Sequence, residues 1–175
     1  MKMPSPLPKS HPDFAHVRLL CTDVDGVLTD GSLYYGADGN IITRFQVLDG
    51  HGLKSVQAAG ILTCFVTMSD TDQIRRRAAD LRIDYCLSGI RDKVAAISAL
   101  LKDLGIDWSE TVHIADDVND IGLLQKVALP VCVPNAVDEV QAICRYVTHR
   151  AGGNGAVRDL CDALVASRSP DMTPL

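Results

Sequence analysis

Short apolar runs alternate along the chain with longer stretches in which apolar residues recur every three or four positions. The apolar runs predict strands at residues 17–22, 61–67, 85–87, 111–115, 129–133 and 146–148. The periodic stretches predict helices at residues 50–59, 70–81, 92–104, 117–126, 136–144 and 156–167, with Asp70 capping the second. Because strand–helix–strand repeats favour parallel pairing with right-handed crossovers, this order predicts an α/β fold with a doubly wound, mainly parallel sheet.

Two shorter runs interrupt this alternation and predict a β-hairpin. Residues 32–35 and 41–47 are rich in β-branched and aromatic residues, and the turn-forming sequence GADGN separates them. We therefore expect one domain over residues 17–167, with the hairpin inserted after its first strand. Residues 1–16 contain four prolines and are expected to form a mobile tail, and residues 168–175 are expected to form a second tail.

The composition narrows the classes of partner and compartment. The 175 residues carry a formal net charge of −5, which argues against a nucleic-acid partner because such proteins usually present a basic face. No apolar run approaches the roughly 20 residues that a membrane span needs, and the N-terminus lacks the apolar region of a signal peptide. The six cysteines include no CxxC pair, so a reduced, cytoplasmic protein without a zinc site is expected.

Polar side chains follow three of the predicted strands. They are Asp23 and Asp25, then Thr67, then Asp116 and Asp117, with Asp120 one helical turn farther on. The carboxyl ends of parallel strands meet at one edge of a sheet, so these carboxylates would repel one another unless a cation neutralised them. Oxygen ligands favour a hard ion such as Mg²⁺, and Lys93 would add a fixed positive charge. Carboxylates, a hydroxyl, a lysine and Mg²⁺ are the parts of a phosphoryl-transfer site.

These residues carry a resemblance to a known family. The sequence DVDGVLTDG, Thr67, Lys93 and the sequence DDVND resemble, in order and spacing, the four motifs of the haloacid dehalogenase superfamily of phosphatases. The hairpin, the sequence DGHG at residues 49–52 and the closing AGGNGAVRDL resemble its capless group of 3-deoxy-manno-octulosonate 8-phosphate phosphatases. The resemblance covers residues 19 to about 164 and implies a Rossmann-like domain without a cap.

The resemblance implies a role for each matching residue. Asp23 is expected to be the nucleophile that takes the phosphoryl group, and Asp25 the general acid and base. Thr67 is expected to bond a phosphate oxygen, and Lys93 to bind phosphate and hold Asp23.

The implied metal site uses three of the acidic positions. Asp23, the main-chain carbonyl of Asp25, and Asp116 are expected to bind Mg²⁺. Asp117 and Asp120 are expected to orient these ligands or their waters. His113, which lies inside an apolar run, is expected to be a core histidine with its hydrogen bonds satisfied.

The chain differs from the group at positions that are expected to determine substrate specificity. Thr67-Met68-Ser69 replaces the usual Thr-Gly-Arg, and Leu48 replaces the arginine of the usual Asn-Val-Arg-Asp-Gly sequence. Losing arginines removes bidentate binding of a substrate carboxylate, so several acidic sugar phosphates stay open as substrates. The residues expected to contact substrate are Gln46, Asp49, Gly50, Lys54, Ser69, Arg77 and Arg158.

Together these features predict a Mg²⁺-dependent phosphomonoesterase acting on a phosphorylated keto-deoxy sugar acid through an aspartyl-phosphate. The resemblance also implies a cytoplasmic enzyme of lipopolysaccharide biosynthesis, and a homotetramer whose hairpins pack together and whose C-terminal segments reach neighbouring sites. The alternative is a weakly active regulatory or assembly module associated with acidic-sugar nucleotide biosynthesis. Such a module is expected to carry damaged motifs, whereas this chain keeps Asp23, Asp25, Lys93 and Asp116.

Overall fold

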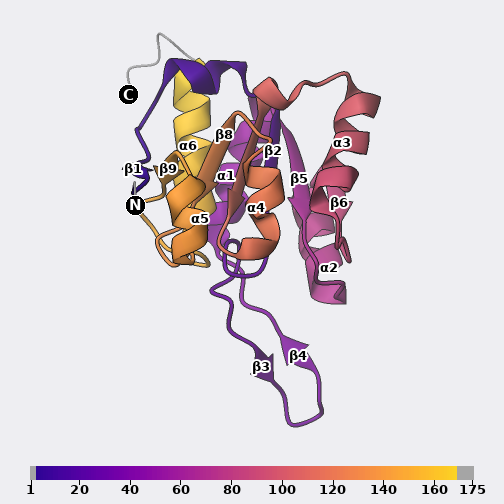
Figure 1. The fold of residues 1–175 in the computed structure, drawn as a ribbon. Coiled ribbons are helices and arrows are strands. Elements are labelled where there is room, and N and C mark those ends of the chain that lie inside the picture. Colours follow the sequence, from indigo (N-terminus) through magenta and orange to yellow (C-terminus); the bar gives the residue numbers. More distant parts are fainter. Residues whose placement is uncertain (1–2, 169–175) are drawn as a thin grey trace.

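The computed structural model describes residues 3–168 and contains a seven-stranded parallel sheet (Figure 1). The sheet order is β1-β9-β8-β7-β2-β5-β6. The strands are β1 (Ser5–Pro6), β2 (Leu19–Thr22), β5 (Leu62–Val66), β6 (Tyr85–Leu87), β7 (Thr111–Ala115), β8 (Leu129–Cys132) and β9 (Tyr146–Val147). The chain leaves β2 toward β5 and β6 and then crosses to β7, so β2 and β7 flank the point where the strand order reverses. Ligand sites of doubly wound sheets lie at such a point.

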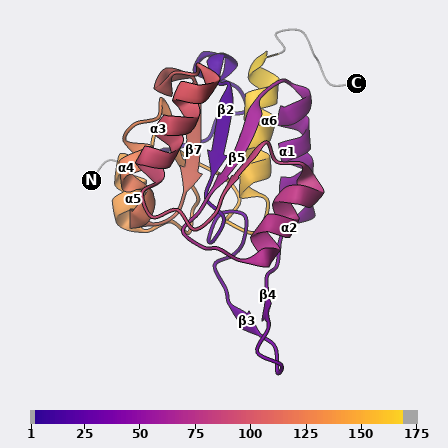
Figure 2. The same ribbon diagram turned by 90° about the vertical axis from the view of Figure 1, so that its right-hand side faces the viewer.

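Helices cover both faces of this sheet (Figure 2). The α-helices are α1 (Val47–Ala58), α2 (Asp72–Leu81), α3 (Lys93–Leu104), α4 (Ile121–Leu124), α5 (Asp138–Ile143) and α6 (Ala156–Arg168). The 3₁₀ helices are η1 (Pro12–His16), η2 (Trp108–Glu110) and η3 (Val118–Asp120). Helices α1, α2 and α6 lie on one face, and α3, α4 and α5 lie on the other. The prediction of a doubly wound α/β sheet is confirmed.

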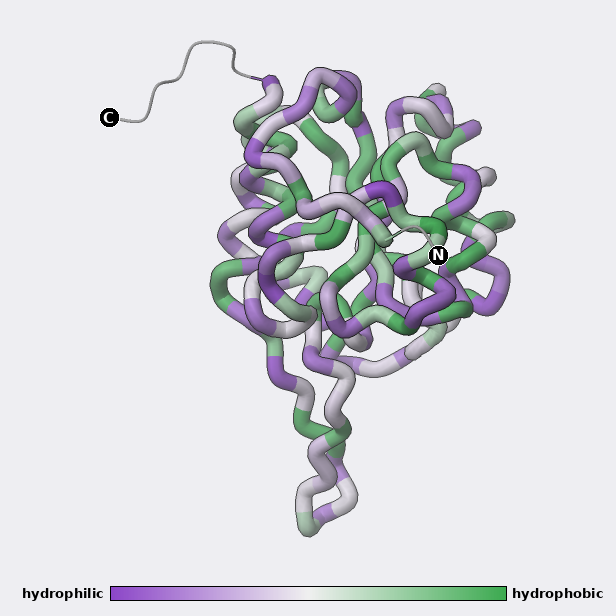
Figure 3. The backbone as a smooth tube through the Cα atoms, turned by 60° about the vertical axis from the view of Figure 1, so that its left-hand side comes forward, coloured by the Kyte–Doolittle hydropathy of each residue, from purple (hydrophilic) through white to green (hydrophobic). Residues whose placement is uncertain are grey.

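The strands are apolar because both of their faces are covered. In Figure 3 the hydrophobic stretches run through the interior of the domain. One core cluster includes Leu20 and Phe65 and is joined by residues of α1 and α6. The second cluster, with Leu19 and Ile97, lies under α3. Because neighbouring side chains of a strand point to opposite faces, Leu19 and Leu20 serve different clusters.

Some element boundaries differ from those predicted. Helix α1 begins at Val47, three residues early, because the Gln46 side chain caps it by accepting from the Val47 N–H at 2.9 Å. Helix α2 is capped by Thr71 rather than Asp70, which instead pairs with Arg75. The predicted helix at 117–126 divides into η3 and α4.

The hairpin projects from the domain, with β3 (Tyr34–Tyr35) paired to β4 (Ile41–Ile42) (Figure 1). It is shorter than predicted, and its apolar side chains are unusually exposed to solvent. Leu33, Tyr35 and Ile42 are 63%, 70% and 62% exposed. Together with Tyr34 they form what we call the hairpin patch.

The expected mobile tail at residues 1–16 is wrong for residues 3–16. Strand β1 pairs with β9, and its Pro6, which has no N–H to donate, lies at the edge of the sheet where none is needed. Phe14 is fully buried and meets Tyr146 edge to face, with ring centroids 5.5 Å apart. Arg168 ends α6, and residues 169–175 of the expected C-terminal tail lie outside the described residues.

Two further observations bear on the predictions. Across residues 3–168, no helix combines the length and apolar character that crossing a membrane requires. All six cysteines are free, and five of them are buried.

Candidate active site

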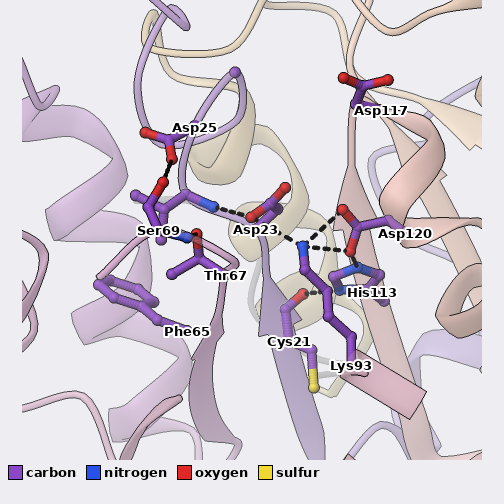
Figure 4. A network of polar contacts seen from close by, with 12 residues as sticks. Cys21, Asp23, Asp25, Phe65, Thr67, Ser69, Lys93, His113, Asp117 and Asp120 are labelled. Atoms are coloured by element: carbon purple, nitrogen blue, oxygen red, sulfur yellow. Dashed lines mark hydrogen bonds and ion pairs between the residues drawn. The ribbon is translucent and has the colours of Figure 1, made fainter. Parts of the chain in front are cut away.

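A cavity of about 440 Å³ opens at the carboxyl edge of the sheet, beside β2 and β7. We call it the acidic cavity. Its lining consists of Asp23, Asp25, Gly26, Gly31, Thr67, Met68, Ser69, Asp116, Asp117, Val118 and Asn119. The strand ends that the sequence analysis singled out therefore do meet in one place. Figure 4 shows part of this site and the residues behind it.

Asp23 follows β2 directly and is only 4% exposed. Its N–H donates to the Ile114 carbonyl of β7 at 3.0 Å, which continues the β2–β7 pairing by one residue. Its Oδ1 accepts from the Val24 N–H at 2.7 Å and lies 3.1 Å from the ammonium of Lys93. Burial and the nearby charge of Asp120 raise the pKa of Asp23 well above its usual range.

Lys93 opens helix α3 and is 2% exposed. Its Nζ donates to both carboxylate oxygens of Asp120, at 2.8 and 2.7 Å. His113 lies on β7 with its Nε2 2.7 Å from Asp120 and its Nδ1 3.2 Å from the Cys21 carbonyl. Burial alone would raise the pKa of Asp120, but the contacts with His113 and Lys93 outweigh it and lower the pKa to about 2. An ionised Asp120 thus fixes Lys93 beside Asp23 (Figure 4).

The contact between His113 and Asp120 was missed by the sequence analysis. It agrees with the expectation that His113 is a satisfied core histidine, but its partner is a charged residue of the site. A signal was present in the sequence. His113 lies in the strand run that ends just before Asp116, so its position near the site was predictable, although its side-chain partner was not.

A tight loop after Asp23 carries Asp25 to the rim of the cavity. The Thr29 hydroxyl accepts from the N–H groups of Gly26 and Gly31, both at 3.2 Å, and so closes this loop. Asp25 is exposed, and its Oδ2 accepts from the Ser69 hydroxyl at 2.5 Å. Asp23 and Asp25 thus share one loop but differ sharply in burial.

Asp116 approaches this loop closely because residue 26 is a glycine. Gly26 has φ of 76°, and a Cβ built on it would lie 1.8 Å from Asp116 Oδ2. Burial and the charges of Asp117 and Asp120 raise the pKa of Asp116 to about 6. The carboxyl therefore lies against the Asp25-Gly26 main chain, where burial and the neighbouring aspartates outweigh the positive charge of Lys93.

The closing glycine segment braces the same loop from behind. A Cβ on Gly152 would lie 1.8 Å from the Gly26 carbonyl oxygen, so only glycine fits there. Asn135 donates to that carbonyl at 2.9 Å and accepts from the Gly152 N–H at 2.8 Å. The sequence AGGNG was predicted as part of a family motif, and its contact with the nucleophile loop is visible only in the structure.

The predicted substrate residues divide into two groups. Ser69 lines the acidic cavity, whereas Gln46, Asp49, Gly50, Lys54, Arg77 and Arg158 do not line it in the described chain. Their expected contact with substrate stays a prediction.

These six residues join helices to one another. Arg77 donates to the Gln46 carbonyl at 3.1 Å and lies against Gly50. Lys54 donates to the Leu81 carbonyl. The remaining two, Asp49 and Arg158, connect α1 and α6.

Asp49 belongs to helix α1, and its side chain is buried against the start of helix α6. Its Oδ1 accepts from the Arg158 N–H at 2.9 Å, while the Arg158 guanidinium bonds Asp162 at 2.6 Å. Burial outweighs the hydrogen bonds from the helix and raises the pKa of Asp49 to about 6. The short sequence DGHG therefore contributes a helix contact that composition alone could not reveal.

The donor set of the cavity fits a divalent cation bound by oxygen. Within residues 3–168, no three His, Cys, Asp or Glu side chains are close enough to hold a metal by themselves. The predicted set differs because it combines two carboxylates, Asp23 and Asp116, with the main-chain carbonyl of Asp25. Burial and the charges of neighbouring aspartates raise the pKa values of both carboxyls, and a bound cation would offset this accumulation of negative charge.

Comparisons with known proteins agree with this geometry. The family profile described as haloacid dehalogenase-like hydrolase matches residues 88–160. The chain is 37% identical over 153 residues to a 3-deoxy-D-manno-octulosonate 8-phosphate phosphatase of Salmonella typhi, covering 87% of this chain and 81% of that protein.

Solved structures give the same result. A phosphatase of this name from Moraxella catarrhalis, in complex with magnesium, phosphate and KDO, aligns with a TM-score of 0.85 at 34% identity and 88% coverage of each chain. A cobalt-bound form from Haemophilus influenzae aligns with a TM-score of 0.85 at 33% identity, covering 89% of this chain and 91% of that chain. The chain therefore belongs to the haloacid dehalogenase-like hydrolases, in the family of 3-deoxy-D-manno-octulosonate 8-phosphate phosphatases, and is a phosphatase.

Proposed function

We propose that this chain hydrolyses 3-deoxy-D-manno-octulosonate 8-phosphate, or a related acidic sugar phosphate, through a phosphorylated aspartate at Asp23. The observation that carries the proposal is the position of Asp23, buried at the floor of the acidic cavity with its Oδ1 3.1 Å from Lys93. The relatives named above support the substrate class.

In the first step a carboxylate oxygen of Asp23 attacks phosphorus, and the bond from phosphorus to the sugar oxygen breaks. Asp25 gives its proton to that oxygen, so the sugar leaves as a neutral alcohol. In the second step Asp25 takes a proton from water, whose oxygen attacks phosphorus and frees the Asp23 carboxylate as inorganic phosphate forms. Asp25 is suited to both steps because it lies at the rim, two residues from the nucleophile.

Other residues of the cavity bind and orient the phosphoryl group. Lys93, held in place by Asp120, offsets negative charge next to Asp23. The Thr67 hydroxyl, which accepts from the Ser69 N–H at 3.1 Å, has its proton free for a phosphate oxygen. Asp23, Asp116 and the Asp25 carbonyl would hold Mg²⁺, which stabilises charge on the transferring group when bound. Asp117, which caps η3, would orient water at this ion.

We also propose the homotetramer and the cytoplasmic location. The hairpin patch supports assembly, because an exposed apolar surface of this kind is unfavourable in water and favours a partner surface. The free, buried cysteines are consistent with a reducing compartment. A role in lipopolysaccharide biosynthesis would follow from the octulosonate substrate.

The test is hydrolysis of 3-deoxy-D-manno-octulosonate 8-phosphate and of 4-nitrophenyl phosphate, each with Mg²⁺ and with EDTA. Asp23→Asn should lower kcat by at least about 10³-fold, since the nucleophile is lost. Asp72→Asn is the matched control, because its side chain is 95% exposed on α2. Wild-type turnover that is unchanged by EDTA or by Asp23→Asn would contradict the mechanism.

The same assay addresses the regulatory or assembly module. That reading expects no more than weak turnover of any sugar phosphate by the wild-type protein. The intact ion-pair set of Asp23, Lys93 and Asp120 favours the enzyme, because a buried charged network without a catalytic role is costly to maintain.

A further inference from the structure

Ser69 stands out in the acidic cavity because its side chain bonds another residue of the site. Its hydroxyl lies 2.5 Å from Asp25 Oδ2, although the two residues are 44 positions apart in the chain. Among residues 3–168, no other side chain bonds the Asp25 carboxylate. Figure 4 shows the pair on one side of Asp23, opposite Lys93 and Asp120.

The main chain of Ser69 is fixed on both sides. Its N–H donates to Thr67 Oγ1 at 3.1 Å, and its carbonyl accepts from the Gly89 N–H at 3.0 Å. The Thr67 carbonyl in turn accepts from the Ile90 N–H at 2.9 Å. The hydroxyl is therefore presented from a rigid turn that joins the end of β5 to the loop leading into Lys93.

The direction of this hydrogen bond limits what Ser69 can do for substrate. A serine hydroxyl has a single proton, and Asp25 Oδ2 accepts the hydrogen bond from it, which leaves the other carboxyl oxygen of Asp25 to carry the proton of the acid form. When that proton is directed to Asp25, the hydroxyl offers only lone pairs to the cavity. Lone pairs do not bind the oxygens of a phosphate or a sugar carboxylate, so of the expected contacts of Ser69 with substrate only those with a donating sugar hydroxyl fit this geometry.

We propose that Ser69 is a positioning residue that holds the Asp25 side chain in line for proton transfer to the leaving oxygen. An exposed aspartate on a loop samples several rotamers, and an anchored hydroxyl donor selects one of them. The inference rests on the proposed function, in which Asp25 is the general acid. The inference also assigns a function to the serine that replaces the usual arginine at position 69.

The experiment compares Ser69→Ala and Ser69→Thr with wild type on 4-nitrophenyl phosphate and on phenyl phosphate. The two esters are similar in shape, but phenolate needs protonation far more than 4-nitrophenolate does. Ser69→Ala should lower kcat/KM for phenyl phosphate about 10-fold, a part of the 10²–10⁴-fold that a general acid supplies, and for 4-nitrophenyl phosphate less than about 3-fold. Ser69→Thr, which keeps the hydroxyl, should restore most of the loss.

Two controls separate positioning from other roles. In an Asp25→Asn background, Ser69→Ala should cause no further loss with phenyl phosphate, because the residue acts through Asp25. Ser88→Ala is the matched control, since the Ser88 hydroxyl donates to the exposed Asp70 carboxylate at 2.9 Å outside the cavity, and it should behave as wild type.

Three results would overturn the inference. They are an equal loss on both esters, a rise in KM alone, or an additive loss in the Asp25→Asn background. Failure of the proposed function would look different, because the wild-type protein would then hydrolyse neither ester in a Mg²⁺-dependent way.

Discussion

At the scale of single residues, the site depends on how a few charges are paired. Lys93 lies between Asp23 and Asp120 with 2% of its surface exposed, so three ionisable side chains lie together with little contact with solvent. Such a group is costly to desolvate, and its stability depends on keeping the charges matched. His113 completes it by orienting Asp120 from behind.

Replacing Lys93 with methionine should therefore harm both stability and activity. Two buried carboxylates would lose their cation, and the free energy of unfolding should fall by about 3–5 kcal/mol. Urea unfolding monitored by circular dichroism measures this loss. Lys102→Met, at an exposed position of the same helix, should leave both properties near wild type. A Lys93→Met protein with wild-type stability would show that the three charges are not coupled.

At the scale of elements, two contacts attach the N-terminal segment and helix α6 to the rest of the domain. The N-terminal segment inserts Phe14 beside Tyr146, and α6 begins on the buried carboxyl of Asp49. Both contacts join parts of the chain that are more than 100 positions apart. Helix packing and edge strands of this kind are specified by tertiary neighbours rather than by local pattern.

Phe14→Ala should show that the N-terminal segment belongs to the domain. Removing a fully buried aromatic ring should lower the free energy of unfolding by about 3–5 kcal/mol. Met3→Ala, which truncates a side chain that is 66% exposed in the same segment, should change it little. Equal effects of the two substitutions on the urea midpoint would mean that the segment does not pack in solution.

Asp49 should make stability depend on pH. Its folded pKa of about 6 lies above the ordinary aspartate value, so between about pH 4 and 6 the unfolded chain loses its proton first. The free energy of unfolding should therefore fall as pH rises through this window, by on the order of 3 kcal/mol from this group, and the loss should be complete above pH 6.

Asp49→Asn measures that contribution. Urea titrations at pH 4 and pH 7 give the free energy of unfolding of both proteins. From pH 4 to pH 7, the value for wild type should fall relative to that for Asp49→Asn by this amount. Asp72→Asn, at an exposed position, should follow wild type across the range. If Asp49→Asn also followed wild type, the carboxyl would be ionised in the folded protein at pH 5.

At the scale of the whole molecule, the hairpin patch is the feature that a single chain leaves unexplained. Its four apolar side chains lie on a hairpin that projects from the domain and contacts little of it (Figure 1). Burying such side chains stabilises an assembly by roughly 25 cal/mol per Å² of apolar surface. The proposed tetramer would bury the hairpin patch, because several copies of the hairpin could cover one another.

The solution mass tests this. Wild type should elute with a mass near four times 18.9 kDa in light scattering coupled to size exclusion. The double substitution Leu33→Asp and Ile42→Asp should reduce the mass, because charged side chains oppose burial of the patch. Met3→Asp introduces the same kind of charged side chain at an exposed site outside the hairpin and should keep the wild-type mass. A wild-type monomer would contradict the assembly.

The amino-acid pattern was enough to predict the parallel sheet, its central strands and the polar residues that meet at the acidic cavity. Alternating apolar runs specify strands covered on both faces, and acids such as Asp23 and Asp116 at strand ends follow from sheet geometry. Tertiary structure alone decided which charges pair. The contacts of Lys93 with Asp120, of Ser69 with Asp25, and of Gly152 with the Gly26 carbonyl each join distant segments. Periodicity reports which face of an element is buried, but it carries no information on which side chain lies opposite.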